Sequence, residues 1–566
     1  MTQTEIERPL LDPSPIRVVC VGAGFSGLSL AHSLQHRLKA TSDNSGGYID
    51  FTIYEKNPDV GGTWYENTYP GVACDVASHV YVFEFENNPN WSTYFSSGEE
   101  ILQYVKNTTA KYQLDKHIKF KHKMVESIWD DYRGVWHLRV EGPDGDIVED
   151  YCHVLVNAAG ILHKWKWPLI DGLTDFKGDL FHSAQWDHSK SLQDKTVLLI
   201  GNGSSAIQIL PQIAKQAKHI YNTIRNPTWI TPMANEFFTK GVNFSYSEEQ
   251  KKDFEDHPDH LKEYQEMIED DLNAFTFCMM QNGPGQQREQ DSYIKKMTTR
   301  LQNKQNLVEG LIPAYKAGCR RLTPGTGYLE ALTLPHVELI QSSVDKITEN
   351  GATLNVVKNI SRPADHDTKT QFEREITVDA IICATGFDVS FLPYWKIIGL
   401  NGTDLSEQWK LIPKAYLSVA VPNMPNYFIF NGPHCPISHG SVMTAINAET
   451  HYISDWIEKI ACERIKRMTP RQNIVDQAYK FYQSELKRSV YADDCQSWYK
   501  PTPTSEITAL YPGTMKHFAF MLQNIRGEHF EVEYDNPENW FAFYGSGRTL
   551  SEAKKPNGYM EIIEQN

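Results

Sequence analysis

Two glycine-rich loops of the kind that binds a pyrophosphate occur in the sequence, Gly22-Ala-Gly24-Phe-Ser-Gly27 and Gly201-Asn-Gly203-Ser-Ser-Ala206. In such a loop the glycines allow a tight turn and a close backbone approach to the pyrophosphate, whose charge is met by the N-terminus of the following helix. The first glycines are 179 residues apart (201 − 22). The pair predicts two nucleotide cofactors that face one cleft. The expected contacts are Gly22, Gly24, Ser26 and Gly27 in the first loop and Gly201, Asn202, Gly203, Ser204, Ser205 and Ala206 in the second.

Each loop lies between a strand-type run and a helix-type run. Apolar residues fill 18–21 and 197–200, and helix-like stretches begin at 28 and 207. A dinucleotide-binding loop requires this strand, turn and helix context. The sequence therefore satisfies the requirement twice.

The charge that follows the next strand distinguishes the two loops. Glu55 ends the predicted strand 51–54, and its carboxylate favours an unmodified ribose, as in FAD or NAD. It lies 28 residues after Gly27 (55 − 27) where about 20 is usual, and the polar run 41–47 explains the excess as an inserted surface loop. Arg225 follows the predicted strand 219–224 and suits a 2′-phosphate. We predict FAD at the first loop and NADPH at the second, the alternative being that Glu55 and Arg225 are ordinary solvated strand-end charges.

Length and charge limit the function classes. A chain of 566 residues is long enough for two or three domains, and a net charge of −16 disfavours nucleic acid and anionic membrane surfaces as partners. No run reaches the length of a membrane-spanning helix, and residues 1–8 lack the pattern of a targeting segment. We expect a cytoplasmic enzyme.

The nine cysteines are scattered, with no CxxC and no metal-ligand spacing. A disulfide framework and a metal site are therefore disfavoured. The absence of a closely spaced redox pair also disfavours a disulfide reductase, which needs such a pair beside its flavin.

Two strands that end in small residues, 153–160 and 380–386, predict the domain organisation. We take the second as the return of the chain from the second nucleotide unit to the first. The expected parts are an FAD-binding domain at 1–160, an NADPH-binding domain at 161–375 with a helical insertion at about 246–312, and the rest of the FAD-binding domain with C-terminal loops at 376–566. The predicted fold class is α/β with two Rossmann-like domains, the NADPH domain inserted in the FAD domain, and a helical subdomain.

The segment Phe176-Lys-Gly178-Asp-Leu-Phe-His182-Ser-Ala-Gln-Trp186-Asp187 resembles the fingerprint F-x-G-x-x-x-H-x-x-x-W-[PD] of the Baeyer-Villiger monooxygenases, a group of class B flavoprotein monooxygenases. Every fixed position matches. The resemblance continues at 61–67, 69–75, 379–386 and 495–500 and covers nearly the whole chain.

The resemblance implies hydride transfer from NADPH to FAD, addition of dioxygen at flavin C4a, and attack of the resulting peroxyflavin on a ketone to give an ester or lactone. It implies catalytic roles for Arg321, as a fixed cation beside the peroxide, and for Asp75, which would hold Arg321 in place. Arg320 would face the 2′-phosphate with Arg225. The other implied cofactor contacts are Thr63, Trp64, Tyr65, Asn67, Asp75 and Tyr81 near the flavin, Ala73 and Cys74 where the nicotinamide half approaches, and Asn226 beside Arg225.

The same residues allow other interpretations. Composition alone favours Arg320 and Arg321 as a solvated pair and Asp75 as a turn or capping residue. We interpret His182 as a satisfied histidine at a domain junction, not as a proton carrier.

The reaction and the substrate also have alternatives. The rival reactions are oxygenation of nitrogen or sulfur by a related class B enzyme, and a redox-silent flavin-binding scaffold. Residues 67–73 lack the arginines that many members carry, which indicates a divergent branch whose members often act on bulky polycyclic or polyketide-derived ketones.

Overall fold

The structure is a computed structural model that describes residues 8–40, 47–232, 243–274, 279–281, 283–358, 370–438, 440–500 and 506–553. The predicted inserted loop and the N-terminal tail lie outside these residues, apart from Gly47 and Arg8. The first and last described segments run side by side, since the Leu10 N–H donates to the carbonyl of Arg548 at 2.6 Å.

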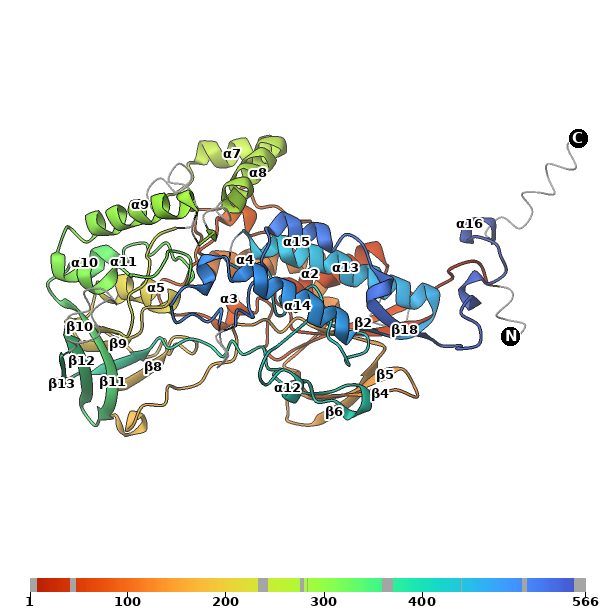
Figure 1. Ribbon diagram of the computed structural model, residues 1–566, viewed down its shortest axis with the longest axis horizontal. Helices are drawn as coiled ribbons and strands as arrows, with labels where there is room; N and C mark the ends of the chain where they lie inside the picture. The colour runs from red at the N-terminus through yellow and green to blue at the C-terminus, as the bar shows by residue number, and fades with distance from the viewer. Residues whose placement is uncertain are drawn as a thin grey trace, which may run out of the picture.

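The first nucleotide loop belongs to a five-stranded sheet in the order β16-β7-β1-β2-β3. All its pairings are parallel, and its apolar strands are buried, as is typical of strands covered on both faces. Helices α2 and α13 pack against each other beside this sheet, where the Ser33 and Ser454 hydroxyls are hydrogen-bonded at 2.9 Å (Figure 1). The elements are β1 (Ile16–Val21), α2 (Phe25–Arg37), β2 (Ile49–Glu55), β3 (Ile118–Phe120), β7 (Val154–Asn157), β16 (Tyr427–Ile429) and α13 (Val442–Glu463).

The second loop belongs to a seven-stranded sheet in the order β13-β12-β11-β10-β9-β14-β8, at the left of Figure 1. Its strands pair in parallel from β11 to β8, while β12 and β13 are antiparallel additions. The elements are β8 (Asp179–His182), β9 (Thr196–Ile200), α5 (Ser204–Ile213), β10 (His219–Ile224), α11 (Tyr328–Ala331), β11 (Val337–Thr348), β12 (Gly351–Lys358), β13 (Thr370–Thr377) and β14 (Ala380–Cys383).

Four described helices form the predicted helical subdomain, which begins at the top of Figure 1 and continues to its left side. Ser247 begins the first of them with a capping box, in which Gln250 and Ser247 satisfy each other's backbone N–H groups. The elements are α7 (Glu248–Asp256), α8 (Pro258–Ala274), α9 (Pro284–Arg300) and α10 (Gln305–Leu311). With the two sheets, these helices confirm the predicted fold class.

A four-stranded sheet in the order β15-β4-β5-β6 was not predicted from the sequence. Trp129, Trp136 and Trp395 pack in one core with residues of the first sheet, among them Val19 and Leu155. Its strands are β4 (Lys123–Asp130), β5 (Val135–Glu141), β6 (Ile147–Cys152) and β15 (Lys396–Ile398). The remaining elements are α3 (Thr63–Glu66), α4 (Gly98–Lys111), α12 (Leu405–Gln408), β17 (Ile465–Pro470), α14 (Gln472–Leu486), α15 (Met515–Met521), β18 (Phe530–Tyr534) and α16 (Leu550–Ala553).

Strand β14 corrects the predicted route of the chain. The sequence favoured it as the start of the return to the first unit, with the boundary at 375, but it lies between β8 and β9 in the second sheet. The chain therefore leaves the second sheet only after Cys383. The small residues after β14 lie against the second glycine-rich loop.

None of the described helices is both long enough and apolar enough to span a membrane.

Candidate active site

The first glycine of each loop lies against the end of a neighbouring strand, in the same way in both units. Gly22 has φ +108°, and a Cβ at this position would lie 2.6 Å from the carbonyl oxygen of Ala158, which follows β7. Gly201 has φ +118°, and its Cβ would lie 2.6 Å from the carbonyl oxygen of Ala384, which follows β14. Only glycine fits such a position. The two small-residue strand ends are thus equivalent, and each closes one loop.

The rest of each loop fits a pyrophosphate. A Cβ at Gly27 would collide with the carbonyl oxygen of Gly22, whereas Ala206 fits at the matching position of the second loop. A Cβ at Gly203 would meet nothing within 4 Å, so there is space in front of the backbone that begins α5. Ser26 and Gly27 lie in the first turn of α2, and Ser204, Ser205 and Ala206 lie in the first turn of α5. Helix N-termini behind such turns are anion sites.

Glu55 braces the first loop. Its Oε2 accepts from the Ala23 N–H at 2.7 Å and its Oε1 accepts from the Asn57 N–H at 2.8 Å, and the residue is 4% exposed. Burial raises the pKa of Glu55, although the two backbone hydrogen bonds oppose this rise. This bracing role of Glu55 was not predicted from the sequence, and the predicted contact with a ribose hydroxyl stays a prediction.

The basic residues predicted for the 2′-phosphate lie around one short segment after β10. Arg225 and Asn226 are exposed there, and the Asn226 carbonyl accepts from Asn202 Nδ2 at 2.7 Å. Arg320 reaches the same segment, where its Nη1 donates to the carbonyl of Pro227 at 3.4 Å. The structure therefore brings Arg320 close to the Arg225 side of the second loop.

Helix α3 and the chain after it carry the residues predicted to contact the flavin. A Cβ at Gly24 would lie 3.6 Å from the Cα of Gly62, so the start of α3 adjoins the first loop. Trp64 Nε1 donates to the Tyr81 hydroxyl at 3.2 Å. Thr63 and Tyr65 lie on α3, and Asn67 ends it by donating from Nδ2 to the carbonyl of Thr63 at 2.9 Å.

Arg321 and Asp75 form an ion pair that joins the two nucleotide units. Arg321 Nε and Nη2 each donate to one carboxylate oxygen of Asp75 at 2.7 Å, and Nη1 donates to the carbonyl of Ile437 at 2.8 Å. The two side chains are 20% and 19% exposed. Burial disfavours the charged guanidinium, but Asp75 outweighs it and raises the pKa of Arg321, so this side chain remains a cation. The alternatives of a solvated arginine pair and of a capping aspartate therefore fail for Arg321 and Asp75.

A second link between the units runs through α5. The Tyr69 hydroxyl donates to Gln208 Oε1 at 2.7 Å, and Gln208 Nε2 donates to the carbonyl of Ala73 at 2.9 Å. Cys74 is buried between Ala73 and Asp75, and burial raises the pKa of its thiol. The predicted nicotinamide segment 73–75 is therefore held against the second nucleotide unit.

The fingerprint residues form a junction. His182 is 1% exposed at the end of β8, stacks on Trp165 with ring centroids 4.2 Å apart, and accepts at Nδ1 from the Ala184 N–H. Burial lowers the pKa of His182 to about 4, so it is neutral at pH 7. A Cβ at Gly178 would contact both the carbonyl of Asp379 and the ring of Phe176, and Trp186 stacks on Phe181. This packing supports the interpretation of His182 as a structural residue.

One disulfide bond contradicts the expectation from the cysteine spacing. Cys319 and Cys495 are bonded although they are 176 residues apart. No local pattern marks such a pair, because only tertiary contacts bring the two segments together. Six other described cysteines are free.

Two further buried residues, one of them beside Arg321, were not predicted as site residues. Tyr499 lies beside Arg321. Burial raises the pKa of its phenol to about 12, and the nearby guanidinium opposes this rise. Glu449 is 0% exposed on α13, and both its oxygens accept from the Asn431 N–H, while burial raises the pKa of its carboxyl well above the ordinary range. The segment 495–500 was a signal for Tyr499, whereas nothing in the sequence marks Glu449.

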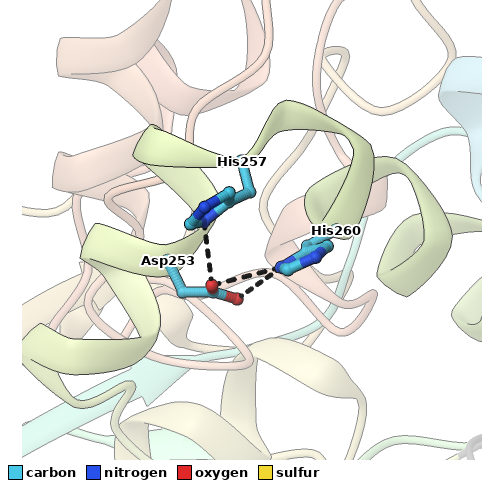
Figure 2. Close-up of side chains that lie close together, drawn as sticks. All are labelled: Asp253, His257 and His260. Carbon is cyan, nitrogen blue, oxygen red and sulfur yellow. Dashed lines mark hydrogen bonds and ion pairs between the residues drawn. The ribbon is translucent and has the colours of Figure 1, made fainter.

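Among the described residues one group of three side chains could hold a metal ion, and it lies on the helical subdomain. Figure 2 shows that Asp253 lies between His257 and His260, with each imidazole Nδ1 at 3.1 Å from a carboxylate oxygen. The three side chains are 45–58% exposed, so the group lies on the solvent-facing surface of the helices. We assign them no role in the site, and the predicted absence of a metal stays a prediction.

Known proteins resemble this chain over nearly its whole length. Residues 16–244 match the family described as flavin-binding monooxygenase-like. The FAD-binding monooxygenase tazF of Aspergillus terreus is 39% identical over 554 residues, which make up 97% of this chain and 94% of the relative. A Baeyer-Villiger monooxygenase of Pseudomonas aeruginosa is 30% identical over 507 residues, 88% of each chain. The solved structure of OTEMO in complex with FAD and NADP has the same fold, with a TM-score of 0.75 at 23% identity over 92% of this chain and 100% of that one.

Proposed function

The chain belongs to the class B flavin-binding monooxygenases of the Baeyer-Villiger type, and from this premise we propose that it inserts one atom of dioxygen beside a ketone carbonyl to give an ester or lactone. The observation that carries the proposal is the Arg321–Asp75 ion pair, which places a fixed cation where the two nucleotide units meet. The required cofactors are FAD and NADPH. Bound FAD, once reduced by NADPH, supplies the electrons that split dioxygen between the product and water.

The residues present fit both cofactors. We propose that Gly22, Gly24, Ser26 and Gly27 hold the FAD pyrophosphate, because a side chain at Gly22 or Gly27 would clash with backbone. Residues 201–206 would hold the NADPH pyrophosphate through the same geometry. Arg225, Asn226 and Arg320 would surround the 2′-phosphate, since paired guanidinium hydrogen bonds suit that group. The predicted flavin contacts on and after α3 adjoin the first loop through Gly62.

Arg321 would stabilise the negative charge that develops as oxygen transfers to the ketone. A donor that is already fixed needs no reorganisation when this charge appears, and the effect is larger in a site that excludes water. Asp75 would act by orientation, because its bidentate contact fixes the plane of the guanidinium. Arginine suits this role better than lysine because it is always charged and offers several donors.

We propose a bulky polycyclic ketone as substrate. The support is the divergence of residues 67–73 from the arginine-containing form of many family members. The test is incubation with NADPH, ¹⁸O₂ and a panel of polycyclic ketones, small ketones and sulfides. Incorporation of one labelled atom into polycyclic ketones supports the proposal, whereas labelled sulfoxides alone would establish the heteroatom alternative.

The Arg321→Ala variant tests the reaction itself. It should abolish ketone oxygenation and leave reduction of the flavin by NADPH within about twofold of the unchanged protein, with Arg321→Lys as the matched variant of partial activity. Sustained ester formation in Arg321→Ala would overturn the proposed role. A protein that is yellow but does not bleach with NADPH in the absence of air would overturn the enzyme assignment and favour a scaffold.

A further inference from the structure

The disulfide bond between Cys319 and Cys495 lies next to the proposed catalytic arginine. Cys319 is two residues before Arg321 and is fully buried. Cys495 begins the C-terminal segment 495–500, which returns to the site from far along the chain. The bond therefore links the segment that carries Arg321 covalently to residues 495–500.

Noncovalent contacts surround this bond on both segments. The Lys316 N–H donates to Asp493 Oδ2 at 2.6 Å. Lys500 Nζ donates to the carbonyl of Asp493 at 2.7 Å and lies 3.9 Å from Cys319 Sγ. We refer to residues 493–500 as the clamp, because both of its ends contact the segment 316–319.

The clamp contacts both halves of the proposed site. On the NADPH side, Asn226 Nδ2 donates to Gln496 Oε1 at 3.3 Å, next to Arg225. On the other side, the buried Tyr499 lies beside Arg321. A displacement of the clamp would therefore disturb the nucleotide segment and the guanidinium together.

We propose that the Cys319–Cys495 disulfide is a positioning element that holds the clamp against Arg321 and the NADPH segment, and that its reduction by a dithiol uncouples NADPH consumption from oxygenation. The inference rests on the proposed function. In the reductive step a dithiol supplies two electrons and two protons: the protein S–S bond breaks, two protein thiols form, and the dithiol becomes a disulfide. The Arg321–Asp75 pair contains no sulfur and survives the step. Arg321 then keeps its contacts with Asp75 and with the carbonyl of Ile437, but the covalent tie between its segment and the clamp is lost.

The test compares oxidised and dithiol-treated holoenzyme, after peptide mapping without reductant has confirmed the bond. Three quantities are measured: the rate of flavin reduction, the KM for NADPH, and the ratio of oxygenated product to NADPH consumed. We expect reduction of the disulfide to raise the KM for NADPH about fivefold and to lower the ratio of oxygenated product to NADPH consumed at least threefold. The double variant Cys319→Ser/Cys495→Ser should behave like the reduced protein and should not respond to the dithiol.

The control is Cys462→Ser, because Cys462 is a free, half-buried cysteine on α13 away from the clamp. It should respond to the dithiol as the unchanged protein does. Equal KM and product ratio in the two redox states would overturn the proposal, as would free thiols at both positions after mild oxidation. If the double variant does not fold, the dithiol titration of the unchanged protein decides alone.

Failure of the clamp and failure of the proposed function give different results. Flavin reduction and the KM for NADPH need no ketone, so a redox response in both, without any oxygenated product, would support the clamp and refute the ketone reaction. Ester formation whose yield and KM for NADPH are the same before and after disulfide reduction would support the ketone reaction and refute the clamp.

Discussion

Replacing Asp75 with asparagine should separate the orientation of Arg321 from the other steps of turnover. The substitution keeps the shape of the side chain but removes its charge, and only one amide oxygen remains to accept from the guanidinium. The lost hydrogen bond is charge-assisted, at 2.7 Å, between side chains that are about one-fifth exposed. Hydrogen bonds to charged groups contribute about 1.5–3 kcal/mol, and we take about 2 kcal/mol here to allow for partial exposure.

This energy corresponds to a fall of about 30-fold in the rate of ketone oxygenation, since each 1.36 kcal/mol is tenfold. Flavin reduction by NADPH should change by less than about twofold. The assay combines stopped-flow reduction of the flavin with product analysis, and it is repeated for Arg321→Met and for the double variant.

In the proposed mechanism Asp75 acts through Arg321, so the two substitutions should not be additive. Once Arg321 is methionine, Asp75→Asn should lower the oxygenation rate almost no further. Additive losses, or full oxygenation by Asp75→Asn alone, would refute the orienting role. An equal loss of flavin reduction would instead show that Asp75 serves the nicotinamide.

Three other predictions, made with four variants, test separate parts of the structure. Gly22→Ala should lower FAD retention, and Gly201→Ala should instead raise the KM for NADPH, because each added Cβ would meet a strand-end carbonyl at 2.6 Å. Flavin absorbance measures the first effect and NADPH saturation the second. Loss of FAD from Gly201→Ala, or a raised KM for NADPH in Gly22→Ala, would contradict the cofactor assignment. Arg225→Ala should reduce the ratio of kcat/KM for NADPH to kcat/KM for NADH by roughly 10- to 100-fold, because one hydrogen bond to a charged group is lost. An unchanged ratio would exclude Arg225 from the 2′-phosphate site. Burial lowers the pKa of His79 to about 4, so the unfolded chain takes up the proton first and stability is lost as the pH falls from about 6.5 toward 4. His79→Phe should recover about 1 kcal/mol of that loss at pH 5.5 in urea unfolding, and an unaltered pH dependence would refute this cause.

Local patterns were sufficient to predict the nucleotide loops. The turn of each loop depends on a few consecutive dihedral angles, and the strand before it and the helix after it are neighbours in sequence. The same holds for Arg225, which immediately follows β10. The helical subdomain was predictable because one of its helices, α8, has 17 residues and buries Leu261, Ile268 and Leu272 at helical spacing.

Features that depend on distant pairings were not predictable. β7 and β14 are both short apolar strands that end in small residues, and only their neighbours show that each closes a different loop. The Cys319–Cys495 bond has no local signal because its partners are brought together by the complete fold. Glu449 is buried in a helix where a single acidic residue gives no periodic pattern.

The position of Arg321 depends on both nucleotide units. Asp75 lies between β2 and β3 of the first sheet, whereas Arg321 lies between β10 and β11 of the second, so their ion pair crosses the junction. The Gln208 link crosses the same junction from α5. A cation placed in this way is in position only when the two units are in register. On the proposed function, the contacts that align NADPH with FAD would also align the charge needed after hydride transfer, so oxygenation would depend on the same geometry as flavin reduction.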